Sequence, residues 1–349
     1  MKPVRAAVIG TGFMGAVHSR SIRAAGGTLV AVVGRSAEQG RSAAEEFGAS
    51  SGTDSLDAAL DAGVDVVHVC TPNASHYPYA KKIVEAGVAV VCEKPLAIAP
   101  DEAAELTSLA AGRGLVATVP FVYRYYASVR EARNRLRVPG ADVPWLLHGS
   151  YLQDWLADPA ATNWRVDAAA GGPSRAFADI GVHWCDLAEF VTGQRITRVS
   201  ARFGSSRAGR ATEDGAVVGF ETDHGALGSV VVSQASPGRK NALSFSFDSA
   251  SASYAFCQET PESLWIGGLA SNEVVLRDPS RTGAPAGLPA GHPQGYYECF
   301  ADFVADTYAA IQGSAPSSGL PTFADGWRAT RITAAVLASA SSGSWVEVS

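Results

Sequence analysis

The segment VRAAVIGTGFMG (residues 4–15) decides the fold that this sequence predicts. Its first, apolar part predicts a strand, and a helical pattern over 14–26 follows directly. Gly10, Gly12 and Gly15 have the G-x-G-x-x-G spacing of a dinucleotide-binding turn at this strand–helix junction. The first glycine allows the tight turn, the second lets the backbone approach a pyrophosphate, and the third lets helix and strand pack closely. The alternative is an ordinary strand–helix turn.

Short β-branched runs and Ala-rich helical stretches keep alternating through the first part of the chain. They read as strand 28–34, helix 37–48, strand 64–70, helix 75–87 and strand 88–93. The last two strands are continuously apolar, which is typical of strands covered on both faces. The alternation predicts βαβ units and a parallel sheet, so the fold class is α/β with an N-terminal Rossmann domain.

The pattern changes after residue 122. The strand-like segments there are 145–152, 196–204, 214–222, 226–235, 243–248 and 252–257. Several are adjacent and joined by short turns, and helical stretches at 125–137 and 179–192 accompany them. We therefore predict an α+β arrangement, with an open, mainly antiparallel sheet and helices on one face.

The end of the chain completes the predicted organisation. A loop rich in Pro and Gly covers 277–295, and helices over 296–312 and 323–342 follow it. We expect two domains: a Rossmann NAD(P)-binding domain over 1–122, and a substrate-binding and oligomerisation domain over 123–349.

The composition argues against several kinds of protein. Of the 349 residues, 47% are apolar and 18% are charged, which is enough for a sizeable core. A net charge of −6 without a long basic run makes nucleic acid and anionic membrane unexpected partners. We expect neither a membrane span nor a signal peptide. The five cysteines are widely spaced, so we expect reduced thiols, no metal site and a cytoplasmic protein.

The end of the second strand bears on which dinucleotide binds. An acidic residue usually lies about 20 residues beyond the glycine turn and binds the ribose 2′-hydroxyl. Gly34, Arg35 and Ser36 occupy that end here, and none is acidic. Because an arginine pairs well with a phosphate, the sequence favours NADP over NAD. The alternative is that Arg35 is only a solvated loop charge.

Two further motifs place acid–base residues. Lys94, in CEKPLA, follows a predicted parallel strand, at the edge where ligands of such sheets bind. Asp179 and His183, in FADIGVHWCDL (177–187), are four apart and share one helical face. Oxidation of an alcohol needs a proton acceptor such as histidine, and a nearby ammonium keeps a carboxylate ionised. Alternatively, Asp179 caps the helix and His183 is a core histidine. Asp186 either orients His183 or bonds neighbouring backbone.

Four motifs in this order resemble the Gfo/Idh/MocA oxidoreductase family: GTGFMG, CTPNASHYP, EKP and GGPSRAFADIGVHWCDL. The closing stretch LPTFADGWRATRITAAVLASASSGSWVEV also resembles the family's last helix and strand, so the resemblance runs end to end. It implies a Rossmann domain and a second domain with an open sheet. It also implies that His183 exchanges the proton, that Lys94 hydrogen-bonds the reacting oxygen, and that Asp179 binds a substrate hydroxyl or orients His183.

The resemblance implies two further sets of residues. The expected cofactor contacts are Gly10, Gly12, Phe13, Met14, Gly15, Arg35, Ser36, Thr71, Pro72, Asn73, His76, Glu93, Lys94, Trp164 and Arg165. The expected substrate contacts are Lys94, Tyr123, Gln153, Asp179, His183 and Tyr296. For Trp164 and Arg165 a structural role is the alternative, and Arg124 is expected only to anchor the crossover between domains. Asp154 and Trp155, beside Gln153, either face a sugar ring or occupy strand-edge and core positions.

We therefore predict an NAD(P)-dependent oxidoreductase that transfers a hydride between a nicotinamide and a secondary alcohol or ketone of a sugar or cyclitol. The predicted NADP preference makes reduction of a keto-sugar the favoured direction. Two alternatives share the fold: a glycoside hydrolase that uses a tightly held nicotinamide, and a non-catalytic dinucleotide-binding sensor. The sheet of the second domain lacks an obvious cover on one face, which predicts a homodimer or homotetramer.

Overall fold

The computed structural model describes residues 2–158, 160–161, 163–278, 289, 291–315 and 318–349. The chain forms two compact units. The first comprises residues 1–122 and 296–328, and the second comprises 123–295 and 329–349. The division after residue 122 coincides with the expected one. The segment 296–328, which the sequence placed in the second domain, instead packs with the first unit.

The first unit is built on a six-stranded parallel sheet in the order β3-β2-β1-β4-β5-β6. Its strands are β1 (Arg5–Ile9), β2 (Thr28–Val33), β3 (Ser51–Thr53), β4 (Val66–Val69), β5 (Ala89–Cys92) and β6 (Ala117–Thr118). β1 and β4 lie side by side but are not consecutive in the chain, so the strand order reverses between them. In an open parallel sheet, ligands bind beyond the carboxyl ends of the strands at this reversal. The parallel sheet that the sequence predicted is confirmed.

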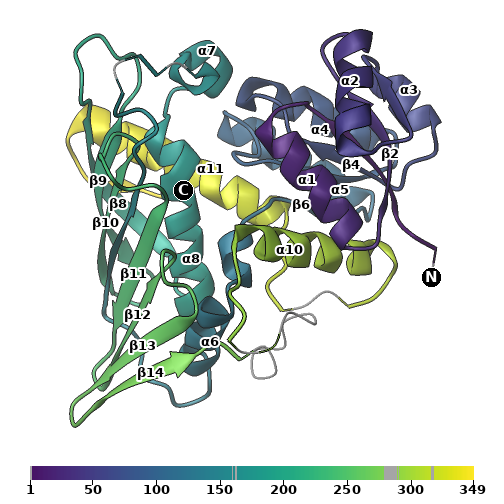
Figure 1. The fold of residues 1–349 in the computed structure, drawn as a ribbon. Helices are drawn as coiled ribbons and strands as arrows, with labels where there is room; N and C mark the ends of the chain where they lie inside the picture. Colours follow the sequence, from purple (N-terminus) through teal and green to yellow (C-terminus); the bar gives the residue numbers. More distant parts are fainter. Residues whose placement is uncertain (1, 159, 162, 279–288, 290, 316–317) are drawn as a thin grey trace. The chain divides into compact units, whose positions relative to one another are not determined.

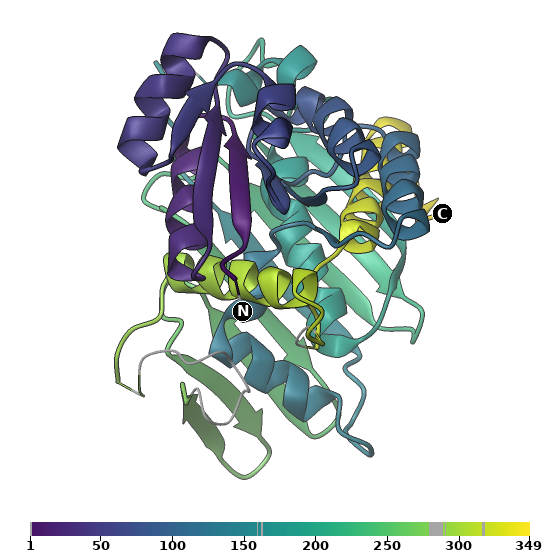
Figure 2. The ribbon, with the colours of Figure 1, turned by 90° about the vertical axis from the view of Figure 1, so that its right-hand side faces the viewer.

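Helices of the first unit lie along this sheet (Figure 1). They are α1 (Phe13–Ala24), α2 (Ala37–Phe47), α3 (Leu56–Asp61), α4 (His76–Glu85), α5 (Pro100–Gly112), α10 (Tyr296–Ile311) and the start of α11 (Phe323–Ser342), with the short turn η1 (Asn73–Ser75). Figure 2 shows α10 beside α1, with which it packs. Phe300, Phe303 and Tyr308 of α10 are buried. This packing explains why a segment far along the chain completes the first unit.

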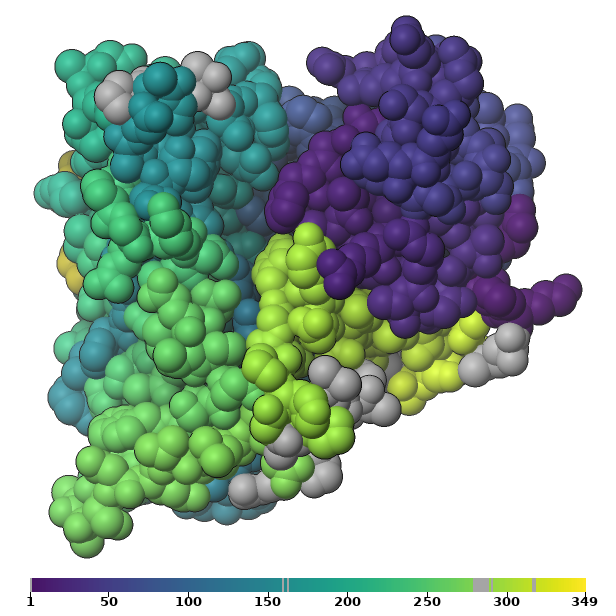
Figure 3. Space-filling view, in the orientation of Figure 1, coloured from purple at the N-terminus to yellow at the C-terminus, as the bar shows by residue number. Residues whose placement is uncertain are grey.

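The second unit contains a nine-stranded sheet in the order β14-β13-β12-β11-β7-β10-β9-β8-β15. Its strands are β7 (Leu146–Leu152), β8 (Ile196–Gly204), β9 (Gly215–Thr222), β10 (Leu227–Ser233), β11 (Ala242–Asp248), β12 (Ala252–Cys257), β13 (Ser263–Gly268), β14 (Asn272–Leu276) and β15 (Val346–Glu347). Neighbours are antiparallel except β7 and β10, which are parallel. Figure 3 shows the β13–β14 hairpin at the surface of this unit.

Side chains alternate across the second sheet as expected for a sheet with one covered face. On β9, Val218 and Phe220 are buried, whereas Val217 is exposed. The covering helices are α6 (Ala127–Leu136) and α8 (Val182–Thr192), and Trp184 of α8 donates from Nε1 to the Ser244 carbonyl on β11 at 2.9 Å. The remaining short elements are η2 (Val122–Tyr125), η3 (Trp164–Val166), α7 (Ala168–Gly171) and the π-helical turn η4 (Phe177–Gly181).

Several elements escaped the sequence pattern: β3, α3, α5, β6, β13 and β14. The predicted loop over 277–295 lies mostly outside the described residues. All five cysteines are free thiols, and Cys92, Cys185 and Cys299 are buried. None of the helices in the described ranges is both long and apolar enough to cross a membrane.

Candidate active site

The glycine turn between β1 and α1 has the shape that a dinucleotide requires. Gly10 has φ +111°, and a Cβ there would lie 2.5 Å from the Cys70 carbonyl oxygen. A Cβ on Gly15 would lie 2.1 Å from the Gly10 carbonyl oxygen. A Cβ on Gly12 meets nothing within 4 Å, so its backbone faces open space, and α1 begins there without a side-chain cap. The uncapped N–H groups of a helix start suit a pyrophosphate, so these residues fit the group.

The end of β2 has no room for the usual acid. A Cβ on Gly34 would lie 2.5 Å from the Gly40 backbone nitrogen. Ser36 caps α2 by accepting a hydrogen bond from the Gln39 N–H at 3.2 Å, and Arg35 is exposed. An open hollow lies here, lined by Thr11, Arg35, Ser36, Glu38, Gln39, Ser42, Ala43 and Glu46. One cation and two carboxylates thus share the hollow.

The turn that carries Lys94 is held from both sides. The Lys94 backbone N–H donates to Glu93 Oε2 at 3.1 Å, and His18 Nε2 lies 3.1 Å from the other oxygen, Oε1. Beyond the cis Lys94–Pro95 peptide, the Pro95 carbonyl lies 2.7 Å from His76 Nδ1. His18, His76 and Glu93 are all buried. Buried partners therefore fix the backbone on either side of Lys94.

His76 joins this turn to the loop after β4. Its Nε2 lies 2.8 Å from the Thr71 carbonyl, while its Nδ1 faces the Pro95 carbonyl. Ser75 Oγ donates to Thr71 Oγ1 and to the Pro72 carbonyl, at 2.7 Å each, and Asn73 opens η1. The structure thus brings Thr71, His76 and the Lys94 turn together within the first unit.

Burial and the neighbouring polar groups shift the pKa values of Glu93 and His76 in opposite directions. Burial acts to raise the pKa of Glu93, but the His18 hydrogen bond and the charges of His18, Lys94 and His76 outweigh it and lower the pKa. Burial also lowers the pKa of His76, against its two carbonyl contacts and the Glu93 charge. Glu93 is therefore the ionised group of this part of the site.

In the second unit, a buried carboxylate organises the segment that carries Asp179. Glu213 Oε1 accepts from Ser174 Oγ at 2.7 Å and from the backbone N–H groups of Arg175 and Phe177 at 3.0 Å each. Ser174 Oγ in turn accepts from the Ala178 N–H at 3.2 Å. Ser174 and Glu213 thus accept hydrogen bonds from the N–H groups at the start of η4. This is the capping role that the sequence offered for Asp179 as the alternative to a catalytic one.

Asp179 has a hydrogen-bond donor and a cation as partners from outside its own helix. Gln234 Nε2 donates to Asp179 Oδ2 at 2.6 Å, and Arg165 Nε lies 3.5 Å from Oδ1. The Arg165 guanidinium also lies 4.4 Å from the centre of the Trp164 ring, over its face. Asp179 sits in the π-helical turn η4 and His183 in α8, so the turn between them is wider than a regular α-helix gives.

His183 belongs to an aromatic and hydrogen-bonded group. Its ring centre lies 5.1 Å from that of Tyr123, edge to face, and 6.4 Å from that of Tyr151. The Tyr123 and Tyr151 hydroxyls are hydrogen-bonded to each other. Asn241 Oδ1 accepts from the Tyr151 hydroxyl and from Gln153 Nε2, at 2.8 Å each, and Asn241 Nδ2 donates to the Tyr123 hydroxyl at 3.1 Å. The structure therefore brings Tyr123, Gln153 and His183 into one group.

Asp186 forms an ion pair with Arg124, whose Nε donates to Asp186 Oδ2 at 2.8 Å. Both side chains are more than nine-tenths buried. This bond is an additional role for Asp186, and it ties Arg124, which follows the division after residue 122, to α8 within the second unit. Asp154 pairs with Lys240 at 2.6 Å near the surface, and Trp155 Nε1 donates to Gln153 Oε1 at 2.9 Å.

Two models of one protein family match this chain. Residues 4–121 match the oxidoreductase family with an NAD-binding Rossmann fold, and residues 143–253 match the GFO/IDH/MocA C-terminal domain. The chain belongs to the Gfo/Idh/MocA oxidoreductase family.

Three relatives of this family are similar along the whole chain. Levoglucosan dehydrogenase of Pseudarthrobacter phenanthrenivorans is 27% identical, over 100% of this chain and 99% of the relative. The crystal structure of an oxidoreductase domain protein from Kribbella flavida is 33% identical and has a TM-score of 0.93, with both chains fully covered. A levoglucosan dehydrogenase complex with NADH and levoglucosan is 26% identical, with a TM-score of 0.92 and full coverage of both chains.

Membership in the Gfo/Idh/MocA family makes the protein an oxidoreductase with an NAD-binding Rossmann domain. The expected resemblance is thereby confirmed. Of the expected cofactor residues, Gly10 to Arg35, Thr71, His76 and Lys94 lie in the first unit and Trp164 and Arg165 in the second. Tyr296, expected to contact substrate, opens α10 in the first unit, with its ring 5.7 Å from that of Phe300.

The sequence missed four residues of these groups: His18, Tyr151, Gln234 and Asn241. Gln234 and Asn241 lie just outside β10 and β11, far along the chain from Asp179 and Tyr123. No local motif marks them, because only the strand pairing brings them near the site. Tyr151 lies in β7 and Gln153 is the residue just beyond its end, so the spacing of two residues between them was a signal that the sequence offered.

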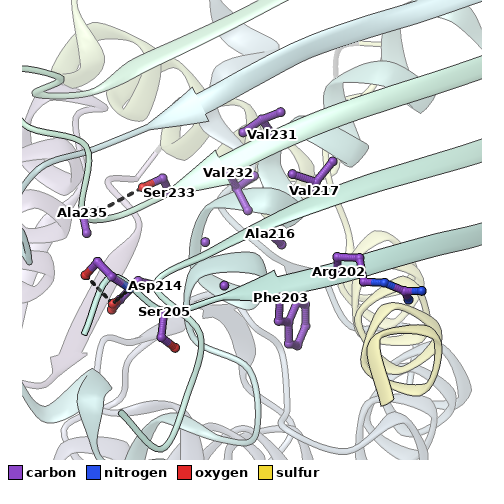
Figure 4. Close-up of a pocket in the computed structure, with 13 residues that line it drawn as sticks. Arg202, Phe203, Ser205, Asp214, Ala216, Val217, Val231, Val232, Ser233 and Ala235 are labelled. Carbon is purple, nitrogen blue, oxygen red and sulfur yellow. Dashed lines mark hydrogen bonds between the residues drawn. The ribbon is translucent and has the colours of Figure 1, made fainter. Parts of the chain in front are cut away.

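A second hollow lies over the ends of β8, β9 and β10 (Figure 4). Val217 and Val231 are paired there across neighbouring strands, and both are exposed. Asp214, at the inner end, accepts from Ser206 Oγ at 2.6 Å and pairs with the buried Arg175. This hollow belongs to the uncovered sheet face rather than to the groups around Asp179 and His183.

Proposed function

We propose that the protein transfers a hydride between a nicotinamide dinucleotide and a secondary alcohol or ketone of a sugar or cyclitol. The observation that carries the proposal is the combination of a dinucleotide turn with a fixed Lys94 in one unit and the Asp179–His183 groups in the other. Relatives named levoglucosan dehydrogenase, D-glucoside 3-dehydrogenase and scyllo-inositol 2-dehydrogenase support the substrate class.

The proposal assigns three catalytic roles. Lys94 hydrogen-bonds the reacting oxygen and stabilises its developing negative charge. His183 takes the hydroxyl proton in oxidation and returns one in reduction, near neutral pH. Asp179 binds a substrate hydroxyl or orients His183, while Arg165 and Gln234 fix its carboxylate. A bound nicotinamide would accept or supply the hydride.

The substrate class is supported by the polar group around His183. Tyr123, Tyr151, Gln153 and Asn241 offer hydroxyl and amide groups that donate and accept, as a ring with several hydroxyls requires. We propose Tyr123 and Gln153 as substrate contacts, with Lys94, Asp179, His183 and Tyr296. Tyr151 and Asn241 hold the first two in place.

The proposed dinucleotide contacts are the turn residues Gly10, Gly12, Phe13, Met14 and Gly15, followed by Arg35, Ser36, Thr71, Pro72, Asn73, His76, Glu93, Lys94, Trp164 and Arg165. NADP is the favoured cofactor, since Gly34 leaves no space for a ribose-binding acid and Arg35 can pair with a 2′-phosphate. Glu38 and Glu46 in the same hollow favour NAD by repelling that phosphate. With NADP, the favoured direction is reduction of a keto-sugar in the cytoplasm.

The uncovered face of the second sheet supports a homodimer or homotetramer. Val217, Leu227, Val231, Trp265, Val274 and Trp345 are exposed large apolar side chains of this unit. Exposed apolar groups of this kind mark interaction surfaces, and symmetric self-association is the commonest use. Replacing Val217 and Val231 with Lys should lower the mass measured by light scattering. An unchanged mass would reject this surface.

Two other functions share the fold. In a nicotinamide-dependent glycoside hydrolase the reduced cofactor would not accumulate, and a sensor would bind dinucleotide without turnover. The deciding experiment incubates the protein with NADP or NAD and a panel of sugars and cyclitols, and with keto-sugars in reverse. Net change in the reduced-nicotinamide absorbance supports the dehydrogenase. Product without that change supports the hydrolase, and neither supports the sensor.

A further inference from the structure

Four buried side chains of the first unit lie in one line of hydrogen bonds. His18 Nε2 lies 3.1 Å from Glu93 Oε1, and His18 Nδ1 lies 2.8 Å from His68 Nδ1. His68 Nε2 lies 3.0 Å from the Tyr308 hydroxyl. These groups come from α1, β4, the end of β5 and α10. His18 and His68 have no exposed surface. Burying such groups costs free energy, and the hydride transfer proposed above uses neither histidine.

The geometry fixes the direction of this chain. An ionised carboxylate only accepts, so His18 Nε2 donates to Glu93. A neutral His18 then has a bare Nδ1, which accepts from His68 Nδ1–H. The bare Nε2 of His68 in turn accepts from the Tyr308 hydroxyl. Burial raises the pKa of Tyr308 well above its ordinary value, so the phenol keeps its proton.

The opposite direction leaves one hydrogen without a partner. It requires a doubly protonated His18 that donates to His68, and a His68 that donates to the Tyr308 oxygen. The Tyr308 hydroxyl hydrogen would then have no acceptor among the residues that the structure describes. Burial also lowers the pKa of His68 well below its ordinary value. The unmatched hydrogen favours two neutral imidazoles, and burial favours a neutral His68 in either direction.

The chain ends on the turn that carries Lys94. Glu93 Oε1 receives the His18 bond, and Glu93 Oε2 receives the Lys94 backbone N–H at 3.1 Å. One carboxylate therefore connects the chain with the backbone of the proposed catalytic lysine. If Glu93 took up a proton, it would lose its negative charge, and both hydrogen bonds would become weaker.

The titratable and charged groups that interact electrostatically with Glu93 come from α1 and α4, from β5 and the end of β4, and from the Lys94 turn. They are His18 of α1, Cys70 after β4, Cys92 of β5, His76 of α4, and Lys94. Burial raises the pKa of both thiols, so they stay neutral at physiological pH. The hydrogen bond from His18 and the charge of Lys94 favour the carboxylate.

We infer that Tyr308, His68 and His18 are positioning residues that hold Glu93 ionised and fixed against the backbone of Lys94. They act through Glu93 and touch no substrate. Their effect is to keep the Lys94 turn in one arrangement as the pH falls. The inference rests on the proposed function only in giving Lys94 its role at the reacting oxygen.

The first test does not depend on enzymatic turnover. In protein labelled with ¹⁵N-histidine, long-range ¹H–¹⁵N spectra near neutral pH distinguish the tautomers of the seven histidines. His18 is expected to carry its proton on Nε2 and His68 on Nδ1. A doubly protonated His18, or the reverse tautomers, overturns the chain as inferred.

The second test compares matched variants by the pH dependence of dinucleotide binding, because the proton exchange proposed for His183 shapes the pH profile of kcat. His68→Leu removes the donor to His18, and His68→Asn restores a donor near the Nδ1 position. The acidic limb of the profile should move up by roughly 0.5–1 pH unit in His68→Leu, the size expected for one hydrogen bond. It should stay near its wild-type position in His68→Asn.

Tyrosine variants keep the test decisive where His68→Leu fails to fold. Tyr308→Phe should move the limb in the same direction by less. Tyr77→Phe is its control, because the Tyr77 hydroxyl donates to Glu105 at the surface of the same unit, 2.6 Å away. An unchanged limb in Tyr308→Phe and in any folded His68→Leu overturns the inference. Wild-type protein without turnover on any polyol would overturn the proposed function instead, and the spectra would still test the chain.

Discussion

Arg165 Nε lies 3.5 Å from Asp179 Oδ1, so the carboxylate proposed for catalysis has a cationic partner within its own unit. Gln234 Nε2 holds the other oxygen at 2.6 Å. The sequence had assigned the charge near Asp179 to Lys94. The structure adds a charge from the segment before α7, and this charge couples a proposed cofactor contact, Arg165, to a proposed catalytic group.

This coupling predicts the behaviour of Asp179→Asn. The amide keeps the size of the side chain but loses the charge that Arg165 pairs with, so kcat/KM should fall by about 100-fold or more. Asp248→Asn is the control, since Asp248 faces His148 on the sheet at 3.4 Å. Steady-state kinetics of both variants check the prediction, and equal activities would remove Asp179 from the mechanism.

Replacement of Lys94 by Met should abolish turnover while dinucleotide binding persists. The side chain that stabilises the reacting oxygen is lost, which costs about 100-fold or more in kcat, whereas the glycine turn is untouched. Lys81→Met, which breaks a surface pair with Glu105, should keep wild-type activity. Fluorescence titration with reduced dinucleotide separates binding from chemistry. Normal kcat in Lys94→Met contradicts its assigned role.

The cofactor preference depends on a single cation. Arg35→Ala should weaken NADPH binding by about 10-fold or more, the size of a charge-assisted hydrogen bond, and leave NADH binding nearly unchanged. Glu38→Gln should act oppositely, strengthening NADPH binding by removing repulsion. Titrations of both dinucleotides measure the ratio. If the ratio stays at the wild-type value in both variants, Arg35 is a solvated loop charge and the NADP preference is wrong.

The Arg124–Asp186 pair should act on stability. Arg124→Met removes the Arg124 cation from the buried Asp186 carboxylate, which costs about 3–5 kcal/mol of unfolding free energy. The double variant Arg124→Met/Asp186→Leu removes both charges and should recover most of that loss. Urea denaturation of the three proteins forms the comparison. A single variant as stable as wild type would show that the pair contributes little.

Acid should destabilise the protein through its buried histidines. Burial lowers the folded-state pKa of His68 and of His76 below the ordinary value near 6.5. Below that value the unfolded chain binds more protons than the folded one, so the unfolding free energy should fall as the pH drops from about 6.5. The fall should be shallower in His68→Leu and unchanged in His224→Gln, where the histidine is exposed. Denaturant titrations across this pH range test it.

The sequence predicted most helices and strands of the fold, because the hydrophobic period and the Gly and Pro residues between elements are local signals. The helix over 323–342 and the strands over 196–204 and 252–257 have the bounds that the pattern gave. β3 was missed because three residues are too few to show a period, and β14 is an edge strand of five residues. β13 was also missed, although it is as long as β12. The placement of α10 in the first unit depends on packing with α1, which no local pattern reports.

The candidate site likewise contains residues that local motifs reveal and partners that only long-range packing brings near. Residues in motifs, such as Gly10, Lys94 and His183, could be named from the sequence. Their partners could not, because Gln234, Asn241 and Tyr308 reach the site through strand order and helix packing. The Arg124–Asp186 bond likewise joins residues from two helical segments that no spacing rule relates.

The most direct test of the central claim follows nicotinamide absorbance during turnover of a sugar or cyclitol panel, with wild type, Lys94→Met and His183→Gln side by side. The account predicts a net change in reduced nicotinamide equal to the amount of product with wild type, and at most about one hundredth of that rate in either variant. Product formed without net change in nicotinamide, or variants as fast as wild type, would contradict it.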